Sequence, residues 1–222
     1  MKIVQPSVEL LDYMGSDLSV VNAARVSFAK ESEWEQEMND GPPQLTVKDQ
    51  KLISYLAKHG HWSPYAHNSL TFRIKAPIFV ARQLVKHQVG GVWNEVSRRY
   101  VDDEPEFYLP TLLHEAPKNA KQGAGDILFE GELIHELRLA TLRSLSTYLS
   151  LLQQGVAPEE ARMVLPLNCM TEWWWTGSLM FFARVCKQRL DSHAQSATRD
   201  IAKMISEQVP QEFQHSWKAL MQ

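Results

Sequence analysis

The sequence predicts an α+β fold, a single domain with a small antiparallel sheet packed by several helices, including one long helix. The chain has 222 residues, of which 44% are hydrophobic, so residues 1–222 are expected to form one domain around one sizeable core. Ser69–Lys75 alternates polar and apolar residues, as a half-buried strand does. Asp126–Gln154 carries leucines at mixed three- and four-residue steps and stops before Gly155, which indicates the longest helix.

The N-terminal part of the chain is expected to contribute two short strands and a capped helix. Lys2–Gln5 and Val8–Met14 are the predicted strands. Gly15-Ser16-Asp17 offers a cap for a helix that runs through Val20 and Val26.

A second capped helix follows an acidic segment. Glu31–Gln44 contains Gly-Pro-Pro and is expected to be an exposed loop. The spacing Thr46-x-x-Asp49 resembles a capping box, so a helix is predicted from there to about Lys58.

A third helix is predicted from about Ala76 to Gln88, because Pro77 suits a first helical turn. At 100° per residue its polar and apolar residues separate onto two sides. Gly90-Gly91 then ends the helix and frees the backbone for a positive φ or a close approach to a ligand.

The second half of the chain is expected to be mainly helical. Lys118–Gly125 is expected to be a polar loop, and Pro158 to begin a short helix. The tryptophans of Met170–Thr176 are expected to pack in a core or a subunit interface, although stacking on a base or a flavin ring is an alternative. Ser178 precedes a helix predicted over Leu179–Arg189, and the tail, with Pro210, Phe213 and Trp217, is expected to form closing helices.

Composition excludes several classes of function. The net charge is −3 and no segment carries a long basic run, which argues against nucleic acid as the main partner. The chain has two cysteines without paired spacing, as in the reducing cytoplasm, and they offer no zinc site. No apolar stretch reaches about 18 residues and no signal peptide is recognised, so we expect a soluble cytoplasmic protein without membrane contact.

A histidine-rich segment, His59 to His67, invites a metal hypothesis. Its histidines are spaced i, i+2 and i+8 around Gly60 and Pro64, without the helical i, i+4 spacing of common zinc sites and without a carboxylate. No metal site is therefore predicted.

A cluster of positive charge lies in the middle of this acidic chain. Arg82 and Lys86 precede Glu95 in the sequence, and Arg98 and Arg99 follow it. Guanidinium groups match the oxygens of phosphate, so the cluster favours a small anionic ligand. The alternative is an amphipathic helix with a solvated polar face.

The order of residues decides between these alternatives. Arg82-Gln83-x-x-Lys86-His87-Gln88, followed by Asn94-Glu95-x-Ser97-x-Arg99-Tyr100, resembles the diagnostic motif of flavin-dependent thymidylate synthases. Lys86 and Gln88 stand where that family usually has arginines, and eight residues instead of seven separate Gln88 from Ser97.

Shorter segments carry the same resemblance. They are Ala24-Arg-Val-Ser27, His59-Gly-His61-x-Ser63-Pro, Ala161-Arg162-x-x-Leu-Pro and Arg189-x-Asp-x-His-Ala-Gln195. Two further positions depart from the family, because Ala66 replaces a usual glutamate and Met180 a usual arginine.

The resemblance implies reductive methylation of dUMP to dTMP, with FAD as redox carrier, methylenetetrahydrofolate as carbon donor and NADPH as electron source. It also implies a homotetramer with sites between subunits. The residues that it assigns to binding dUMP are Gln83, Glu95, Ser97, Arg98, Arg99, Arg162 and Arg189. Those that it assigns to FAD are Ser27, His61, Ser63, Lys86, His87, Gln88 and Asn94, and Ser178 and Arg184 could add polar contacts.

Catalysis is assigned by the same resemblance to Arg189, whose permanent charge favours the N3-deprotonated pyrimidine and so enriches C5 in electrons. A cysteine thiolate is the alternative way to activate the ring, but Cys169 and Cys186 both lie among apolar residues. Ser97 as a nucleophile lacks an evident Asp-His relay. A relative that transfers another group, such as hydroxymethyl, and a non-catalytic nucleotide-binding subunit without flavin remain open alternatives.

Overall fold

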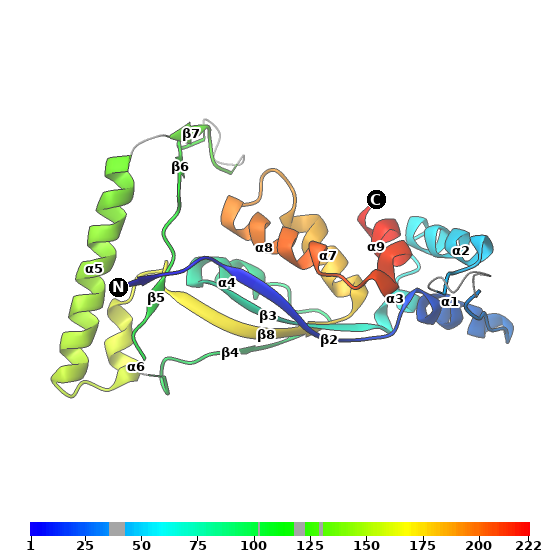
Figure 1. Ribbon diagram of the computed structural model, residues 1–222, viewed down its shortest axis with the longest axis horizontal. Helices are drawn as coiled ribbons and strands as arrows, with labels where there is room; N and C mark the ends of the chain where they lie inside the picture. Colours follow the sequence, from blue (N-terminus) through cyan, green and yellow to red (C-terminus); the bar gives the residue numbers. More distant parts are fainter. Residues whose placement is uncertain (36–42, 102, 118–122, 129–130) are drawn as a thin grey trace.

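The computed structural model describes residues 1–35, 43–101, 103–117, 123–128 and 131–222. Its centre is a four-stranded antiparallel sheet, which confirms the predicted α+β fold (Figure 1). The strands follow the order β2 (Ser7–Met14), β3 (Ser69–Pro77), β8 (Met170–Gly177) and β4 (Gly91–Glu95). The edge strand β4 contains Asn94 and Glu95, the first residues of the second motif segment, so the sheet fixes the start of this segment.

Two small strand pairs lie outside the main sheet. β1 (Lys2–Ile3) pairs in parallel with β5 (Glu106–Phe107). β6 (Leu113–His114) pairs antiparallel with β7 (Ile127–Leu128).

Helices cover one face of the sheet and both of its ends (Figure 1). The face is covered by α4 (Ile78–Leu84), α7 (Leu179–Arg189) and α8 (Ser196–Glu207). One end carries α1 (Asp17–Arg25), α2 (Val47–Lys58), α3 (Ser63–Ala66) and α9 (Gln214–Met221). The other end carries the long helix α5 (Gly131–Gln153) and α6 (Pro158–Ala161). Short 3₁₀ turns are Val26–Phe28, Arg162–Val164 and Gln211–Phe213.

The core lies between the sheet and its helical face. Phe72 of β3 and Trp175 of β8 are buried and meet the ring of Phe182 on α7 edge to face, with ring centroids 4.9 and 5.4 Å apart. A smaller core at the other end joins Leu145 of α5 to Phe107 of β5. In the part of the chain that the structure describes, no helix combines the length and the apolar character needed to cross a membrane.

Serine and threonine caps begin three helices where the sequence predicts them. The hydroxyl of Ser16 accepts from the backbone N–H of Ser19 at α1, and that of Thr46 accepts from Asp49 at α2, over 3.4 and 3.0 Å. Ser178 caps α7 in the same way. The predicted bounds of α7 are therefore confirmed.

The helix predicted from Ala76 to Gln88 is too long at both ends. β3 continues through Pro77, which pairs with Met170 and keeps an extended ψ of 150°. α4 itself ends at Leu84, and the side chain of Arg189 binds the carbonyl of Gln83 in its last turn.

Two strands of the main sheet, β4 and β8, were missed, as were the two-residue strands β5 and β6. The sequence Glu172-Trp-Trp-Trp-Thr176 hides the alternation of a strand, since Trp173 and Trp175 are buried while Trp174 between them is 57% exposed. The prediction that these tryptophans pack in a core is confirmed for the two buried rings.

The predicted start of the long helix at Asp126 is also wrong, because Ile127 and Leu128 form β7 and α5 begins at Gly131. Much of the predicted loops Glu31–Gln44 and Lys118–Gly125 lies outside the described residues. Glu35 and Gln44, which border the first of these gaps, form an antiparallel bridge.

A pair of glycines lets α7 approach the sheet. Gly91 of β4 and Gly177 of β8 are paired in register, and the ring of Phe181 lies against both. A Cβ at Gly91 or Gly177 would come within 2.4 or 2.3 Å of that ring. Side chains at these positions would therefore push the start of α7 away from the sheet.

Gly177→Ala is expected to lower the free energy of unfolding by about 1–3 kcal/mol, because the new methyl group overlaps the ring of Phe181. Urea denaturation of the two proteins measures the difference. Gly131→Ala at the start of α5 is the control, since a Cβ there meets no atom within 4 Å. Equal midpoints for the two variants would contradict this account of the contact.

Candidate functional site

The side chain of Arg189 joins α7 to α4. Its Nη2 donates to the carbonyl oxygen of Gln83 over 2.9 Å, and its Nε donates to Nε2 of His87 over 3.0 Å. Both partners are acceptors without a negative charge, so the guanidinium is oriented while its charge is not neutralised.

His87 lies in a positively charged environment. Burial lowers the pKa of its imidazole, and the charges of Arg189 and Arg184 lower that pKa further. The neutral ring is therefore the form that this site favours.

The amide of Gln83 is already engaged by neighbouring groups. Its Oε1 accepts from the hydroxyl of Thr198 over 3.1 Å, and its Nε2 donates to the amide oxygen of Gln195. The structure thus brings Gln83, His87 and Arg189 together in one group, which we call the Arg189 cluster.

Three other residues predicted to bind dUMP line a separate pocket of 290 Å³. These are Glu95, Arg98 and Arg162, and we call the space the Arg162 pocket. Neither Gln83 nor Arg189 is among its described lining residues. Within one copy of the chain, the predicted nucleotide residues therefore fall into two groups.

Two arginines of the Arg162 pocket are available to an anion. Of the three acidic side chains that line the pocket, Glu106 is bound by Lys2 and Lys75, Glu172 is bound by Arg73 over 2.7 Å, and Glu95 forms no ion pair with a described residue. Arg98 and Arg162 instead donate to backbone carbonyls, those of Asp103 over 2.9 Å and Glu159 over 3.2 Å. Among the described residues, neither arginine forms an ion pair with a carboxylate.

The carboxylate of Glu95 is held by two residues that the sequence did not indicate. Thr171 Oγ1 donates to one oxygen over 2.7 Å, and Trp93 Nε1 donates to the other over 3.1 Å. Trp93 lies two residues before Glu95 on the same strand, β4, whereas Thr171 is brought to Glu95 by the pairing of β4 with β8. No sequence motif marks Thr171, because the pairing joins segments that are far apart in the chain.

Arg99 and Ser97 lie beside this pocket. Arg99 forms an ion pair with Glu159 over 2.9 Å, and the hydroxyl of Ser97 accepts from the backbone N–H of Arg99 over 3.3 Å. Glu159 therefore connects the two arginines: its carboxylate accepts from Arg99, and its backbone carbonyl accepts from Arg162.

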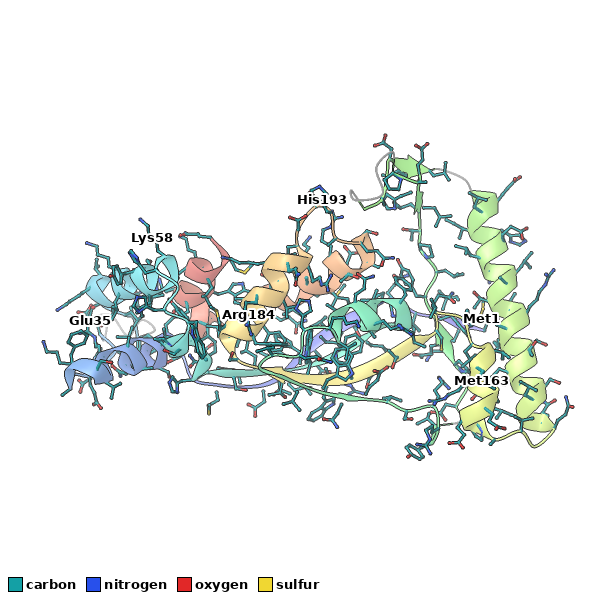
Figure 2. All side chains as sticks on the ribbon, turned by 180° about the vertical axis from the view of Figure 1, so that it is seen from behind. Met1, Glu35, Lys58, Met163, Arg184 and His193 are labelled. Atoms are coloured by element: carbon teal, nitrogen blue, oxygen red, sulfur yellow. The ribbon has the colours of Figure 1, made fainter. Side chains whose placement is uncertain are left out.

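Two residues with possible flavin contacts, Ser178 and Arg184, line a pocket of 850 Å³. We call it the Arg184 pocket. Gly60 and Trp62, which flank His61, also line it, as do Val89 and Gly90 of the glycine corner. Arg184 lies on α7 (Figure 2) and donates to the carbonyl of Val89 over 2.7 Å. Gly90 has a φ of +87°, as predicted for this corner.

The Arg184 pocket also contains two of the departures from the family pattern. Ala66 and Met180 line it, so a carboxylate and a guanidinium are replaced by a methyl group and a thioether. The remaining predicted flavin residues are dispersed over several segments. Ser27 is exposed on the 3₁₀ turn after α1, His61 and Ser63 are exposed around the start of α3, and Lys86, Gln88 and Asn94 are exposed around the glycine corner and on β4.

The histidine-rich segment packs against an aromatic ring. The rings of His59 and His61 have centroids 4.2 and 6.1 Å from that of Tyr55 on α2. Across the described ranges, no three or more His, Cys, Asp or Glu side chains are grouped to hold a metal ion.

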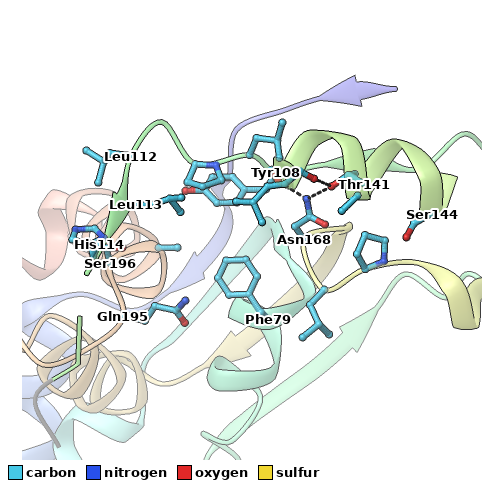
Figure 3. Close-up of a pocket in the computed structure, with 17 residues that line it drawn as sticks. Phe79, Tyr108, Leu112, Leu113, His114, Thr141, Ser144, Asn168, Gln195 and Ser196 are labelled. Carbon is cyan, nitrogen blue, oxygen red and sulfur yellow. Dashed lines mark hydrogen bonds between the residues drawn. The ribbon is translucent and has the colours of Figure 1, made fainter. Parts of the chain in front are cut away.

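Another pocket, of 440 Å³, lies between α5 and the start of α8 (Figure 3). Asn168 spans part of its wall, donating from Nδ2 to the carbonyl of Tyr108 over 2.9 Å and to the hydroxyl of Thr141 over 3.1 Å. None of the described residues that line it was predicted to bind nucleotide or flavin. It borders the Arg189 cluster through Gln195.

Both cysteines are free and fully buried. Burial raises the pKa of the Cys186 thiol to about 12. Burial also raises the pKa of Cys169, and the nearby guanidinium of Arg98 offsets this only in part. Neither thiol is therefore prepared to act as a nucleophile at neutral pH.

Comparisons with known proteins show the family of the chain. The family model described as "Thymidylate synthase complementing protein" matches residues 9–213. A flavin-dependent thymidylate synthase of Thermotoga neapolitana is 41% identical over 207 residues, covering 91% of this chain and 87% of its own. One of Thermus thermophilus is 38% identical over 212 residues, covering 96% and 74%.

The solved structures include a similar fold over the whole chain. The UMP/dUMP methylase PolB of Streptomyces cacaoi, bound with 5-Br dUMP, superposes with a TM-score of 0.84 at 28% identity. The match covers 99% of this chain and 96% of that chain.

A thiol reagent such as dithionitrobenzoate is expected to find almost no reactive cysteine in the native protein at pH 8, because both sulfurs are buried and protonated. In denaturant it should titrate both cysteines of the sequence. Cys186→Ala, titrated in denaturant, calibrates the signal of a single thiol. Rapid reaction of a thiol in the native protein would contradict this prediction and favour the alternative in which a cysteine thiolate activates the pyrimidine ring.

Proposed function

Because the chain belongs to the flavin-dependent thymidylate synthase family, we propose that it methylates dUMP at C5 to give dTMP. Methylenetetrahydrofolate is the proposed carbon donor and NADPH the proposed reductant. The observation that carries the proposal concerns Arg98, Arg162 and Arg189. Neutral acceptors orient these arginines, and none of them forms an ion pair with a carboxylate of the described chain.

The Arg162 pocket suits the phosphate and sugar of a nucleotide. A guanidinium held by a backbone carbonyl keeps most of its donors for a phosphate, and two such groups, Arg98 and Arg162, line the pocket. The oriented carboxylate of Glu95 can accept from a hydroxyl or a ring N–H. Arg99 and Ser97 beside it supply further donors.

Arg189 suits the pyrimidine. Removing the N3 proton places negative charge on the ring, and a fixed cation stabilises that charge without having to transfer a proton itself. Because His87 and the Gln83 carbonyl already orient the guanidinium, little reorganisation is needed when the charge develops.

The Arg184 pocket is compatible with FAD. Its volume of 850 Å³ and its mixture of Trp62, Val92 and Arg184 suit an aromatic ring system that carries a phosphate chain. Ser178 and Arg184 would hold the cofactor there, with His61 and Ser63 at the edge. When bound, FAD supplies the redox chemistry that takes electrons from NADPH to the one-carbon unit.

Two copies of the chain would complete the site. Within one copy, none of the residues described as lining the Arg162 pocket belongs to the Arg189 cluster, although the proposed chemistry needs both on one nucleotide. We therefore propose that the Arg162 pocket of one copy faces the Arg189 cluster of another within a homotetramer.

UMP is a second candidate substrate. The similarity in fold to a UMP/dUMP methylase favours including it in the assay. Equal turnover of UMP and dUMP would indicate a methylase that accepts both nucleotides, instead of a thymidylate synthase specific for dUMP.

Release of tritium from [5-³H]dUMP, with FAD, NADPH and methylenetetrahydrofolate, is the direct assay, because methylation replaces the C5 hydrogen. Arg189→Ala is expected to lower kcat roughly a hundredfold, the effect of removing one stabilising donor. Arg138→Ala, on the exposed surface of α5, is the control and should keep wild-type turnover.

The mass of the product separates methyl from hydroxymethyl transfer. No release of tritium by the wild type would contradict the proposed methylation of dUMP and favour a non-catalytic nucleotide-binding subunit. Turnover by Arg189→Ala at the wild-type rate would contradict the proposal that the charge of Arg189 stabilises the deprotonated pyrimidine.

Arg184→Met is expected to weaken FAD binding about tenfold or more, because it removes the guanidinium from a pocket that already has Met180 and Ala66. Quenching of FAD fluorescence on titration measures the affinity. Lys187→Met, one turn further along α7, is the matched control, since Lys187 is absent from the described lining. Equal losses in both variants would show a general charge effect instead of a site.

A further inference from the structure

The contact between Arg189 and His87 fixes the protonation state of the histidine. A guanidinium has donors and no acceptor, so the ring nitrogen that receives the Nε–H of Arg189 must carry a lone pair. Nε2 of His87 is that nitrogen, 3.0 Å away. The proton of the neutral ring therefore lies on Nδ1.

The groups around His87 are cationic or neutral. Arg184 and Arg189 face it from α7, and Lys86 precedes it in its own segment. From β8 the ring of Trp175 lies with its centroid 6.5 Å away, and it carries no charge. No carboxylate of the described chain forms an ion pair with His87.

We propose that His87 is a positioning residue whose neutral ring holds the guanidinium of Arg189 against the dUMP pyrimidine and whose protonation releases it. A second proton on the ring removes the acceptor and sets two cations against each other. The acid limit of dUMP binding is therefore set by His87. This inference rests on the proposed function, because it assumes that Arg189 meets the pyrimidine.

The direction of the pH dependence follows from the surroundings of the ring. Burial and the two arginines lower the pKa of His87 below its ordinary value of 6.5. At neutral pH the ring is neutral and the contact is formed. As the pH falls through the lowered pKa, the contact and the nucleotide affinity are lost.

The Nδ1–H remains as a donor for another group. The flavin contact predicted for His87 is compatible with the inference, since the two roles use different ring nitrogens. FAD occupancy is therefore measured for each variant, so that lost cofactor is not mistaken for a lost contact with Arg189.

The first experiment reads the ring directly. The FAD-loaded protein is labelled with ¹⁵N at its histidines, and the signals of His87 are assigned by their loss in His87→Gln. We expect the Nδ1–H tautomer, with a titration below that of free histidine. In Arg189→Met we expect a mixture of tautomers and a higher titration point, because an arginine that disfavours the protonated ring is gone. A proton on Nε2, or a titration that Arg189→Met leaves unaltered, would overturn the inference.

The second experiment measures the Kd of dUMP by calorimetry between pH 5 and 8. His87→Gln keeps an acceptor but cannot titrate, and His87→Leu has neither property. The phosphate of dUMP titrates in the same range, so each variant is compared with the wild type at the same pH.

At pH 8 we expect His87→Gln to bind dUMP close to the wild type, and His87→Leu to bind about tenfold more weakly. As the pH falls towards 5, the wild type should become progressively weaker than His87→Gln. His135→Gln, on exposed α5, is the control and should follow the wild type at every pH.

The two hypotheses fail in different ways. Tight dUMP binding with a constant ratio between wild type and His87→Gln would overturn the inference and leave the proposed function standing. Absence of dUMP binding by the wild type at every pH, with the ring signature intact, would overturn the proposed function and with it the nucleotide role of His87.

Discussion

Arginines bound to backbone carbonyls organise the candidate site. Arg98, Arg162, Arg184 and Arg189 each donate to a carbonyl oxygen, over 2.9, 3.2, 2.7 and 2.9 Å. Across the described residues, none of the four forms an ion pair with a carboxylate. A carbonyl fixes the direction of a guanidinium and leaves its charge available, which is the arrangement that an anionic ligand needs. Arginines elsewhere, such as Arg25 and Arg73, bind Asp49 and Glu172 and are neutralised.

The same contacts shape the local fold. Arg189 takes the Gln83 carbonyl in the last turn of α4, and the chain then turns so that His87 reaches the guanidinium. Arg184 holds the carbonyl of Val89 in the following corner. The segment between α4 and β4 is thus fastened to α7 at successive points, and the positive φ of Gly90 lets it turn between them.

Local signals predicted the parts of the fold that depend on neighbouring residues. Ser16, Thr46 and Ser178 mark helix starts because a cap is made within four residues. The end of α4 was not predicted, and one carbonyl of its last turn is bound by an arginine of a helix distant in sequence. β4 and β8 were missed because their partners are distant and because Trp174 interrupts the alternation.

The family resemblance supplied more candidate site residues than residue chemistry did, but it did not predict how they are divided in space. The order of motif residues named both groups of proposed nucleotide residues, and only the structure separates the Arg162 pocket from the Arg189 cluster. Thr171 escaped notice because its bond to Glu95 arises from strand pairing, and Trp93 because β4 itself was not predicted as a strand.

A crystal structure with dUMP bound tests the account most directly. The account predicts the phosphate and sugar at Arg98 and Arg162 of one copy, and the pyrimidine within hydrogen-bond distance of Arg189 of another. A pyrimidine that lies away from Arg189, or that is bonded through C6 to the sulfur of Cys169 or Cys186, would contradict it.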